Sequence, residues 1–297
     1  MQTRLTLAPS ARPHPVLTTP TLRVLGPADL GAALGVLDKD PVANAFVTAR
    51  VLDSGLEAPY LGGEMWGYQR RGRLLALCYS GANLVPVCAG PAAVRAFAAR
   101  ALRQGRVCSS IVGPAGPTAR LWAHLEPRWG PAREVRARQP LMVTGAVPPG
   151  ITPDPQVRPV RKDEMELVLP AAVAMFTEEV GVSPLDAPDG GLTYQARVAE
   201  TVGTGRCFAR VEDGRVVFKA EIGAITPGTC QLQGVWTAPD RRGHGLATAG
   251  LATVLRHALQ EIAPLVSLYV NDFNAPALAV YRRLGFTESG ALMSVLF

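Results

Sequence analysis

Lysine, closely spaced cysteine pairs and long apolar runs are scarce or missing in this 297-residue sequence. Only Lys39, Lys162 and Lys219 among its 30 basic residues are lysine. The five cysteines show no CxxC spacing and no His-rich companion, which argues against a metal site and favours small buried side chains in a reducing compartment. No 18-residue apolar span or signal-peptide pattern occurs, so we expect a cytoplasmic protein without a membrane partner.

Charge is distributed unevenly along the chain. Residues 1–150 hold 17 Lys and Arg against 8 Asp and Glu, whereas residues 151–297 hold 13 against 16. This split predicts two domains with different electrostatic tasks. The basic half carries no basic patch interleaved with aromatic residues, which argues against a nucleic-acid partner. Residues 1–20 contain four prolines and predict a flexible leader.

A proline-rich, nearly uncharged segment, residues 146–156, predicts a linker between domains at residues 21–145 and 157–297. On both sides of it a short strand precedes an acidic helix-capping residue, Asp29 in the first half and Asp163 in the second. This weak repeat predicts duplicated folds. Strands alternate with helices in both halves, which is typical of an α/β (α+β) fold with a mixed sheet flanked by helices.

The second half gives the clearest element boundaries. The pair Asp213-Gly214 is a strong signal for a two-residue hairpin turn. The expected elements after residue 205 are strands at Arg206–Glu212, Arg215–Ile225, Cys230–Thr237 and Leu265–Val270, helices at Leu246–Gln260 and Ala275–Leu284, and a final strand near Leu292–Phe297.

A glycine-containing turn follows the strand that ends at Thr237 and leads directly into a helix. A helix start leaves four backbone N–H groups unpaired and carries partial positive charge. Gly243 and Gly245 have no side chains that would keep a phosphate away from these groups. The turn therefore predicts an anion site, and a glycine turn without a ligand is the alternative. The Rossmann and P-loop fingerprints both fail here, which argues against a nucleotide.

A second segment begins at Asn274, a good helix N-cap, and ends at Gly285, which suits a left-handed C-cap. Tyr281 follows Asn274 by two helical turns, so both lie on one helix face. Helix capping does not explain why a tyrosine stands at position 281. A buried tyrosine with a satisfied hydroxyl is one interpretation, and a catalytic residue is the other.

Together the two segments resemble the GNAT family of acyl-CoA N-acyltransferases. Arg242, Gly245 and Ala247 match its R/Q-x-x-G-x-G/A loop, and the second segment matches N-x-x-A-x-x-x-Y-x-x-x-G-F at Asn274, Ala277, Tyr281, Gly285 and Phe286. The resemblance covers residues 157–297. The first half lacks the loop but resembles a degenerate domain of the same kind, which implies tandem GNAT-like domains. The whole chain resembles actinobacterial proteins with an uncharacterised domain before a GNAT domain.

The resemblance implies acetyl-CoA or another acyl-CoA as co-substrate and no metal. It implies that Tyr281 acts as general acid toward the departing sulfur and also lies against the cofactor. The implied cofactor-binding residues are Val235, Trp236 and Thr237 on the strand, Arg242, Gly243, His244, Gly245, Leu246 and Ala247 in the loop, and Asn274.

The general base is less well marked. Glu221, on the neighbouring strand, is the nearest carboxylate in sequence and our candidate base, and an exposed strand charge beside Lys219 is the alternative. Glu178 and Glu179 lie where the family builds its acceptor site. They predict recognition of a cationic amine, against the alternative of a solvated surface.

These observations predict an N-acetyltransferase that moves an acyl group, most simply acetyl, to a primary amine by direct transfer in a ternary complex. The acceptor can be a small molecule, a protein lysine or an N-terminus, and the oligomeric state is open. Two alternatives stay open: a non-catalytic acyl-CoA-binding sensor, and a nucleotide-binding protein that uses the loop for ATP or a dinucleotide.

Overall fold

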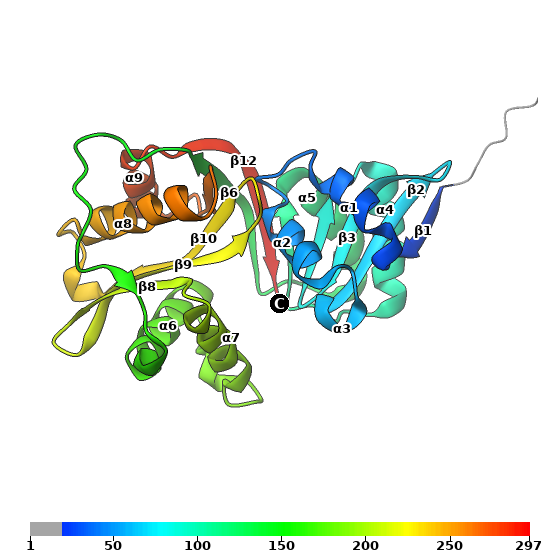
Figure 1. Cartoon of the computed structure of the whole chain (residues 1–297). Helices are drawn as coiled ribbons and strands as arrows, with labels where there is room; N and C mark the ends of the chain where they lie inside the picture. Colours follow the sequence, from blue (N-terminus) through cyan, green and yellow to red (C-terminus); the bar gives the residue numbers. More distant parts are fainter. Residues whose placement is uncertain (1–19) are drawn as a thin grey trace, which may run out of the picture.

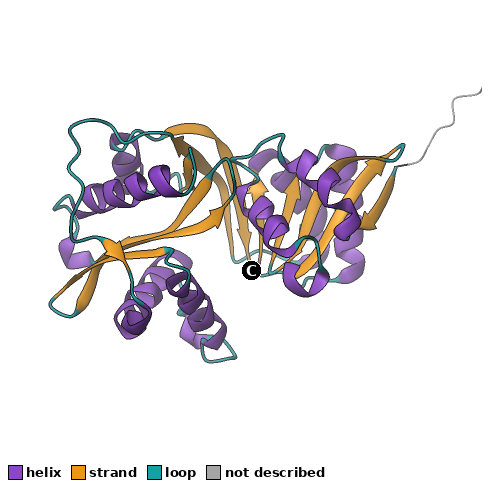
Figure 2. Ribbon diagram, in the orientation of Figure 1, coloured by secondary structure: helices purple, strands orange, loops and turns teal. Residues whose placement is uncertain are grey.

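One twelve-stranded mixed sheet runs through the whole molecule. The computed structural model describes residues 20–297, so the predicted leader, residues 1–20, lies almost entirely outside the described residues. Figure 1 shows the two halves of the chain side by side along this sheet, and Figure 2 shows helices on both of its faces. The predicted α/β architecture with helices flanking a mixed sheet is confirmed.

The N-terminal half supplies the first six strands and five helices of the described chain. Its β2–β3 hairpin turns at Arg71 and Gly72, both with positive φ, as a type I′ turn requires. The strands are β1 (Thr21–Val24), β2 (Gly63–Arg70), β3 (Arg73–Gly81), β4 (Asn83–Val87), β5 (Ser110–Pro114) and β6 (Glu134–Thr144), and the helices are α1 (Leu30–Leu37), α2 (Ala45–Ser54), α3 (Ala58–Leu61), α4 (Pro91–Gln104) and α5 (Ala115–Trp129).

The C-terminal half follows the predicted order of strands and helices. Asp213 and Gly214 adopt positive φ between β8 and β9, which confirms the predicted hairpin turn. The strands are β7 (Arg158–Pro159), β8 (Cys207–Glu212), β9 (Arg215–Ile225), β10 (Cys230–Thr237), β11 (Val266–Tyr269) and β12 (Thr287–Leu296), and the helices are α6 (Met165–Val180), α7 (Leu192–Gly203), α8 (Leu246–Glu261) and α9 (Ala275–Arg283).

The two halves exchange strands at the centre of the sheet. The strand order is β1-β2-β3-β4-β5-β12-β6-β11-β10-β9-β8-β7. The C-terminal strand β12 therefore lies between β5 and β6, and β6 lies between β12 and β11. Each half thus completes the sheet of the other. The division at residues 146–156 stays a prediction about domains, because hydrogen bonds join the halves across the sheet.

The internal repeat is visible in two matching ion pairs. Arg23 pairs with Asp29 at 2.5 Å, and Arg158 pairs with Glu164 at 2.6 Å. Each carboxylate also accepts the backbone N–H three residues before it, at 3.1 and 2.9 Å. These bonds lower the pKa of each carboxyl to about 2. The predicted capping residue of the second half, Asp163, is wrong by one position, because Glu164 makes these contacts.

Apolar side chains fill both faces of the sheet in each half. Helices α1–α3 cover one face of the N-terminal half and α4 and α5 cover the other. In the C-terminal half α6 and α7 lie on one face and α8 and α9 on the opposite face (Figure 1). All five cysteines are free, and all except the half-buried Cys88 are buried, as the composition predicted. No helix within residues 20–297 is long and apolar enough to cross a membrane.

Candidate functional site

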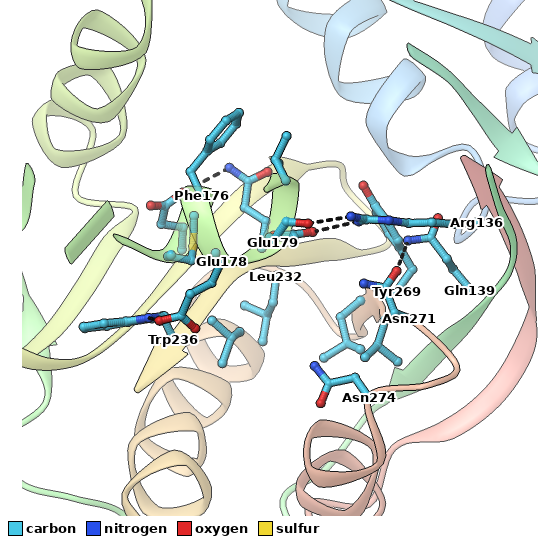
Figure 3. Close-up of a pocket in the computed structure, with 18 of the residues that line it drawn as sticks. Arg136, Gln139, Phe176, Glu178, Glu179, Leu232, Trp236, Tyr269, Asn271 and Asn274 are labelled. Atoms are coloured by element: carbon cyan, nitrogen blue, oxygen red, sulfur yellow. Dashed lines mark hydrogen bonds and ion pairs between the residues drawn. The ribbon is translucent and has the colours of Figure 1, made fainter. Parts of the chain in front are cut away.

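The candidate site lies where two parallel strands separate. β10 and β11 pair only at Cys230 with Val266 and Gln231 with Ser267. Beyond these pairs a cavity of about 660 Å³ opens between the strands. It is lined by residues 232–236 of β10, by residues 268–271 at the end of β11, and by side chains from α6, α9 and β6. Figure 3 shows these side chains converging from both halves of the chain.

A β-bulge shapes the β10 side of the cavity. Gln233 pairs with Glu221 of β9 and Trp236 pairs with Lys219, so Gly234 and Val235 lie opposite Ala220 alone. Gly234 has a φ of +59°, which favours glycine. A Cβ there would lie 3.0 Å from the Lys219 Nζ atom and 3.1 Å from the Glu221 Cδ atom. The bulge therefore requires glycine and leaves two residues of backbone beside the cavity.

The predicted anion loop leads into α8 without a side-chain cap. Gly243 and Gly245 have φ values of +78° and +81°, and nothing lies within 4 Å of where a Cβ would stand on either. No side chain caps the first backbone N–H groups of the helix, and the two glycines leave room for a phosphate beside them. A Cβ on Gly250 would lie 2.6 Å from the Phe218 ring, so this glycine lets α8 pack closely on β9.

Arg242 makes two hydrogen bonds within the chain. Its Nε donates to the Thr237 carbonyl at 3.0 Å, and its Nη2 donates to Glu178 at 2.6 Å. The same glutamate accepts the Trp236 indole N–H at 3.1 Å. Arg242 thus ties the loop to the end of β10 and to α6. The loop does not line the cavity, and Trp236 lies between the two.

The second predicted segment forms the capped helix α9. The Asn274 side chain accepts the Ala277 N–H at 3.2 Å, which confirms the predicted N-cap, and Gly285 has a φ of +85°. Tyr281 lines the cavity and packs edge-on against Phe286, with ring centroids 5.9 Å apart. Burial raises the pKa of the Tyr281 phenol above its ordinary value. The buried phenol therefore carries its proton at neutral pH.

Glu221 belongs to a buried polar network. Its Oε1 accepts a bond from Lys219 at 2.7 Å and its Oε2 accepts one from Gln233 at 3.1 Å. Glu221 is 5% exposed and Lys219 is 0% exposed. The alternative of an exposed strand charge is therefore wrong. Glu221 lines the cavity, and each of its oxygens still has a lone pair for a further donor.

The two candidate acceptor carboxylates on α6 face different partners. Glu178 lies beside Trp236, and Glu179 faces Arg136 at 3.6 Å (Figure 3). Both line the cavity, and their side chains are about half exposed. They are neither free carboxylates nor an unconnected solvated surface, because each connects α6 to another wall of the site.

Strand β6 contributes side chains that our sequence reasoning missed. Arg136 is buried, and its Nη2 donates to the Glu179 carbonyl at 2.5 Å near the end of α6. Such late helix carbonyls have no partner within the helix. Gln139 donates to Asn271 at 2.9 Å and accepts the Ser294 hydroxyl at 2.6 Å. The N-terminal half therefore supplies one wall of the cavity.

Two family profiles match the chain. Residues 173–286 match the acetyltransferase (GNAT) family, and residues 63–168 match a domain of unknown function (DUF4081). The first match contains the cavity strands, the glycine loop and α9.

Three curated relatives carry the name mycothiol acetyltransferase. The protein of Tsukamurella paurometabola is 28% identical over 230 residues, which cover 69% of this chain and 78% of the relative. That of Brachybacterium faecium is 39% identical over 77 residues, which cover 26% of this chain and 23% of the relative. That of Saccharomonospora viridis is 52% identical over 48 residues, or 16% of each chain. The last two matches span less than a quarter of each relative.

Solved structures share the arrangement of the whole chain. A tandem GNAT protein from the clavulanic acid biosynthesis pathway superposes with a TM-score of 0.55 at 19% identity, covering 94% of this chain and 98% of its own. A GCN5-related N-acetyltransferase of Sphaerobacter thermophilus has a TM-score of 0.59 at 17% identity, covering 93% and 95%. At such identities the likeness shows the fold, and it confirms the predicted tandem GNAT-like architecture.

Proposed function

Residues 173–286 belong to the acetyltransferase (GNAT) family, and from that premise we propose that the protein moves the acetyl group of acetyl-CoA to a primary amine in a ternary complex. One observation carries the proposal: the bulged backbone of Gly234 and Val235 and the phenol of Tyr281 line the same gap between β10 and β11. A group that donates to a carbonyl oxygen and a group that protonates a leaving sulfur are the two requirements of this reaction.

The residues around the gap fit acetyl-CoA, which supplies an activated acetyl thioester when bound. The open N–H groups between Gly243 and Ala247, at the start of α8, suit its pyrophosphate, and His244 and Leu246 complete this loop. At residues 235–237, β10 pairs with β9 on one side but has no strand partner on the side of β11, and this open side suits the extended arm that links the phosphates to the thioester. Asn274, at the other side of the gap, lies within reach of the same arm.

The residues of the chain divide the proton transfers between them. The amine nitrogen forms the new C–N bond while the C–S bond breaks, and Tyr281 gives its proton to the departing sulfur. The ammonium first loses a proton to Glu221, directly or through a water molecule, which frees the lone pair of its nitrogen. The second proton, lost when the C–N bond forms, passes to solvent, and Tyr281 regains its proton from solvent. The Val235 N–H donates to the carbonyl oxygen, where negative charge develops.

The acceptor that suits this cavity is a small cationic amine. Four carboxylates, among them Glu178, Glu179 and Glu221, line the cavity together with two guanidinium groups, so the charge of the lining is net negative and attracts an ammonium group. The α6 end and β6 close one side of the space, which limits the size of the acceptor. The relatives named mycothiol acetyltransferase support a small-molecule acceptor over a protein lysine or N-terminus.

A two-step experiment tests this function. Acetyl-CoA should raise the melting temperature of the protein, whereas ATP and NAD at equal concentration should not. Release of free CoA thiol should then depend on one of a panel of small amines and on the acetyl group. Thermal stabilisation by acetyl-CoA without turnover on any amine would instead support a non-catalytic acyl-CoA sensor. Stabilisation by ATP or NAD alone would contradict both.

A further inference from the structure

The side chain of Lys219 is completely buried, although lysine is almost never found so. Its ammonium donates to the Glu221 Oε1 at 2.7 Å and to the Gly234 carbonyl at 3.0 Å, and it lies 3.5 Å from the sulfur of Met175. Burying a charge costs free energy unless it is paired and hydrogen-bonded. The carboxylate of Glu221 provides the opposite charge for the Lys219 ammonium. The bond to a backbone carbonyl of the bulge is an additional contact that charge compensation does not require.

The contact with Gly234 fixes the direction of one peptide group. The carbonyl of Gly234 and the N–H of Val235 belong to the same peptide, and in a planar trans peptide these two groups point in opposite directions. Lys219 does not line the cavity, whereas Gly234 and Val235 do. Because the carbonyl is held toward the buried ammonium, the N–H of Val235 is turned to the other side, toward the cavity.

Because of the bulge, the direction of this peptide has to be fixed by a contact outside the regular strand pairing. In a regular strand pair, the hydrogen bonds to the neighbouring strand orient each peptide. Gly234 and Val235 share a single opposite residue, and β11 has already separated from β10 at this level. The positive φ of Gly234 belongs to a conformation that glycine enters and leaves easily. A positively charged donor on the carbonyl both holds this peptide and polarises its N–H.

We propose that Lys219 is a positioning residue for acetyl transfer: through the Gly234 carbonyl it aims the Val235 N–H at the carbonyl oxygen of the bound acetyl thioester. The inference rests on the proposed function, and it adds a residue that acts through the backbone without touching the substrate. Glu221 then serves a second purpose, because its carboxylate compensates the charge of the buried ammonium.

The carbonyl stretch of bound acetyl-CoA reports this hydrogen bond without any acceptor. Isotope-edited infrared spectra with acetyl-CoA labelled at the thioester carbonyl with ¹³C compare four proteins: wild type, Lys219→Met, Glu221→Gln, and the double variant Lys219→Met/Glu221→Leu. Glu221→Gln is the matched control, because it removes the ion pair but leaves the ammonium on the Gly234 carbonyl. The double variant removes both buried charges at once, so that it folds even where Lys219→Met alone does not.

In wild type and in Glu221→Gln we expect the stretch to shift to lower wavenumber on binding, and in both Lys219 variants we expect most of that shift to be lost. With an amine acceptor, Lys219→Met should also lose about tenfold or more in kcat, while the KM for acetyl-CoA stays within about twofold. An equal shift in all folded variants would overturn the inference and leave the proposed function standing. A wild-type protein that binds no labelled acetyl-CoA would refute the proposed function, and the inference with it.

Discussion

Replacing Arg136 with methionine tests how the N-terminal half supports the acceptor side of the cavity. The guanidinium donates to both carboxylate oxygens of Glu134, at 2.8 and 3.1 Å, and to the Glu179 carbonyl at 2.5 Å. It is buried on β6, while the carbonyl that it holds belongs to α6 of the other half. Methionine keeps much of the side-chain volume and removes every donor.

The structure sets the size of the expected effect. A hydrogen bond to a charged group contributes about 1.5–3 kcal/mol, but the partner Glu134 is 36% exposed, which weakens that pair. Loss of the bond from the buried guanidinium to the Glu179 carbonyl therefore dominates, and we expect a cost of about 2 kcal/mol. Arg138, two residues further along β6, pairs with Glu288 where both side chains are more than 40% exposed. Arg138→Met should cost about 0–1 kcal/mol and is the matched control.

Thermal unfolding measures the loss of stability, and steady-state kinetics measure the effect on the amine. Arg136→Met should lower the melting temperature by roughly 4 °C or more, and Arg138→Met by roughly 2 °C or less. Because α6 carries Glu178 and Glu179, Arg136→Met should also raise the KM for the amine severalfold and leave acetyl-CoA affinity near its wild-type value. If both variants unfold at the same temperature with the same KM, the β6 wall does not support α6 and the reasoning is refuted.

Three further changes test other parts of the account. Gly245→Ala and Gly130→Ala both place a Cβ at a φ near +80°, so both should lose similar stability, but only Gly245→Ala should weaken acetyl-CoA binding, by about tenfold in calorimetry. Glu164→Gln should cost about 1–2 kcal/mol at pH 7 and Asp163→Asn almost nothing. The ion pair with Arg158 lowers the pKa of Glu164 in the folded protein from 4.5 to about 2. The stabilisation that this pair gives is therefore fully present above pH 4.5 and is lost as the pH falls through 2. Acid unfolding curves of the wild type and Glu164→Gln measure this loss. Glu179→Gln should raise the KM for a cationic amine and leave acetyl-CoA affinity unchanged, and unchanged amine kinetics would exclude recognition by this carboxylate.

Local signals explain why the elements around the predicted anion loop and α9 could be predicted. The strand at Cys230–Thr237 ends as expected, and the helix after Gly245 begins as expected. Left-handed glycines and the Asn274 cap satisfy backbone groups within a few residues along the chain, so short patterns carry the information. The roles of Tyr281 and of the loop in catalysis stay predictions, because they depend on a bound ligand.

The β6 wall was missed because its sequence does not resemble a central strand. Arg136, Arg138 and Gln139 are polar, and Pro140 lacks the N–H that a central strand normally donates. The structure accommodates Pro140 next to an irregularity in β12, and its carbonyl still accepts the Val270 N–H at 3.2 Å. Pairing with β11 and β12 joins residues more than 100 positions apart, which no local pattern reveals.

The buried charges were equally hidden. Lysine and glutamate two residues apart on a strand are typical of an exposed face, and only the packing of α6 over β9 encloses Lys219 and Glu221. The same packing brings Glu178 to Arg242, 64 positions away. The predicted anion loop and α6 are therefore connected, although the sequence suggested separate roles for them.

Acetyl transfer by wild type and Tyr281→Phe tests the central claim most directly. The ring keeps its packing against Phe286 in the variant, so stability should change little. With the amine that gives the highest thiol release, we expect kcat to fall about 100-fold or more while acetyl-CoA affinity is unchanged. Equal kcat for the two proteins, or no turnover by wild type on any amine, would contradict catalysis at the gap between β10 and β11.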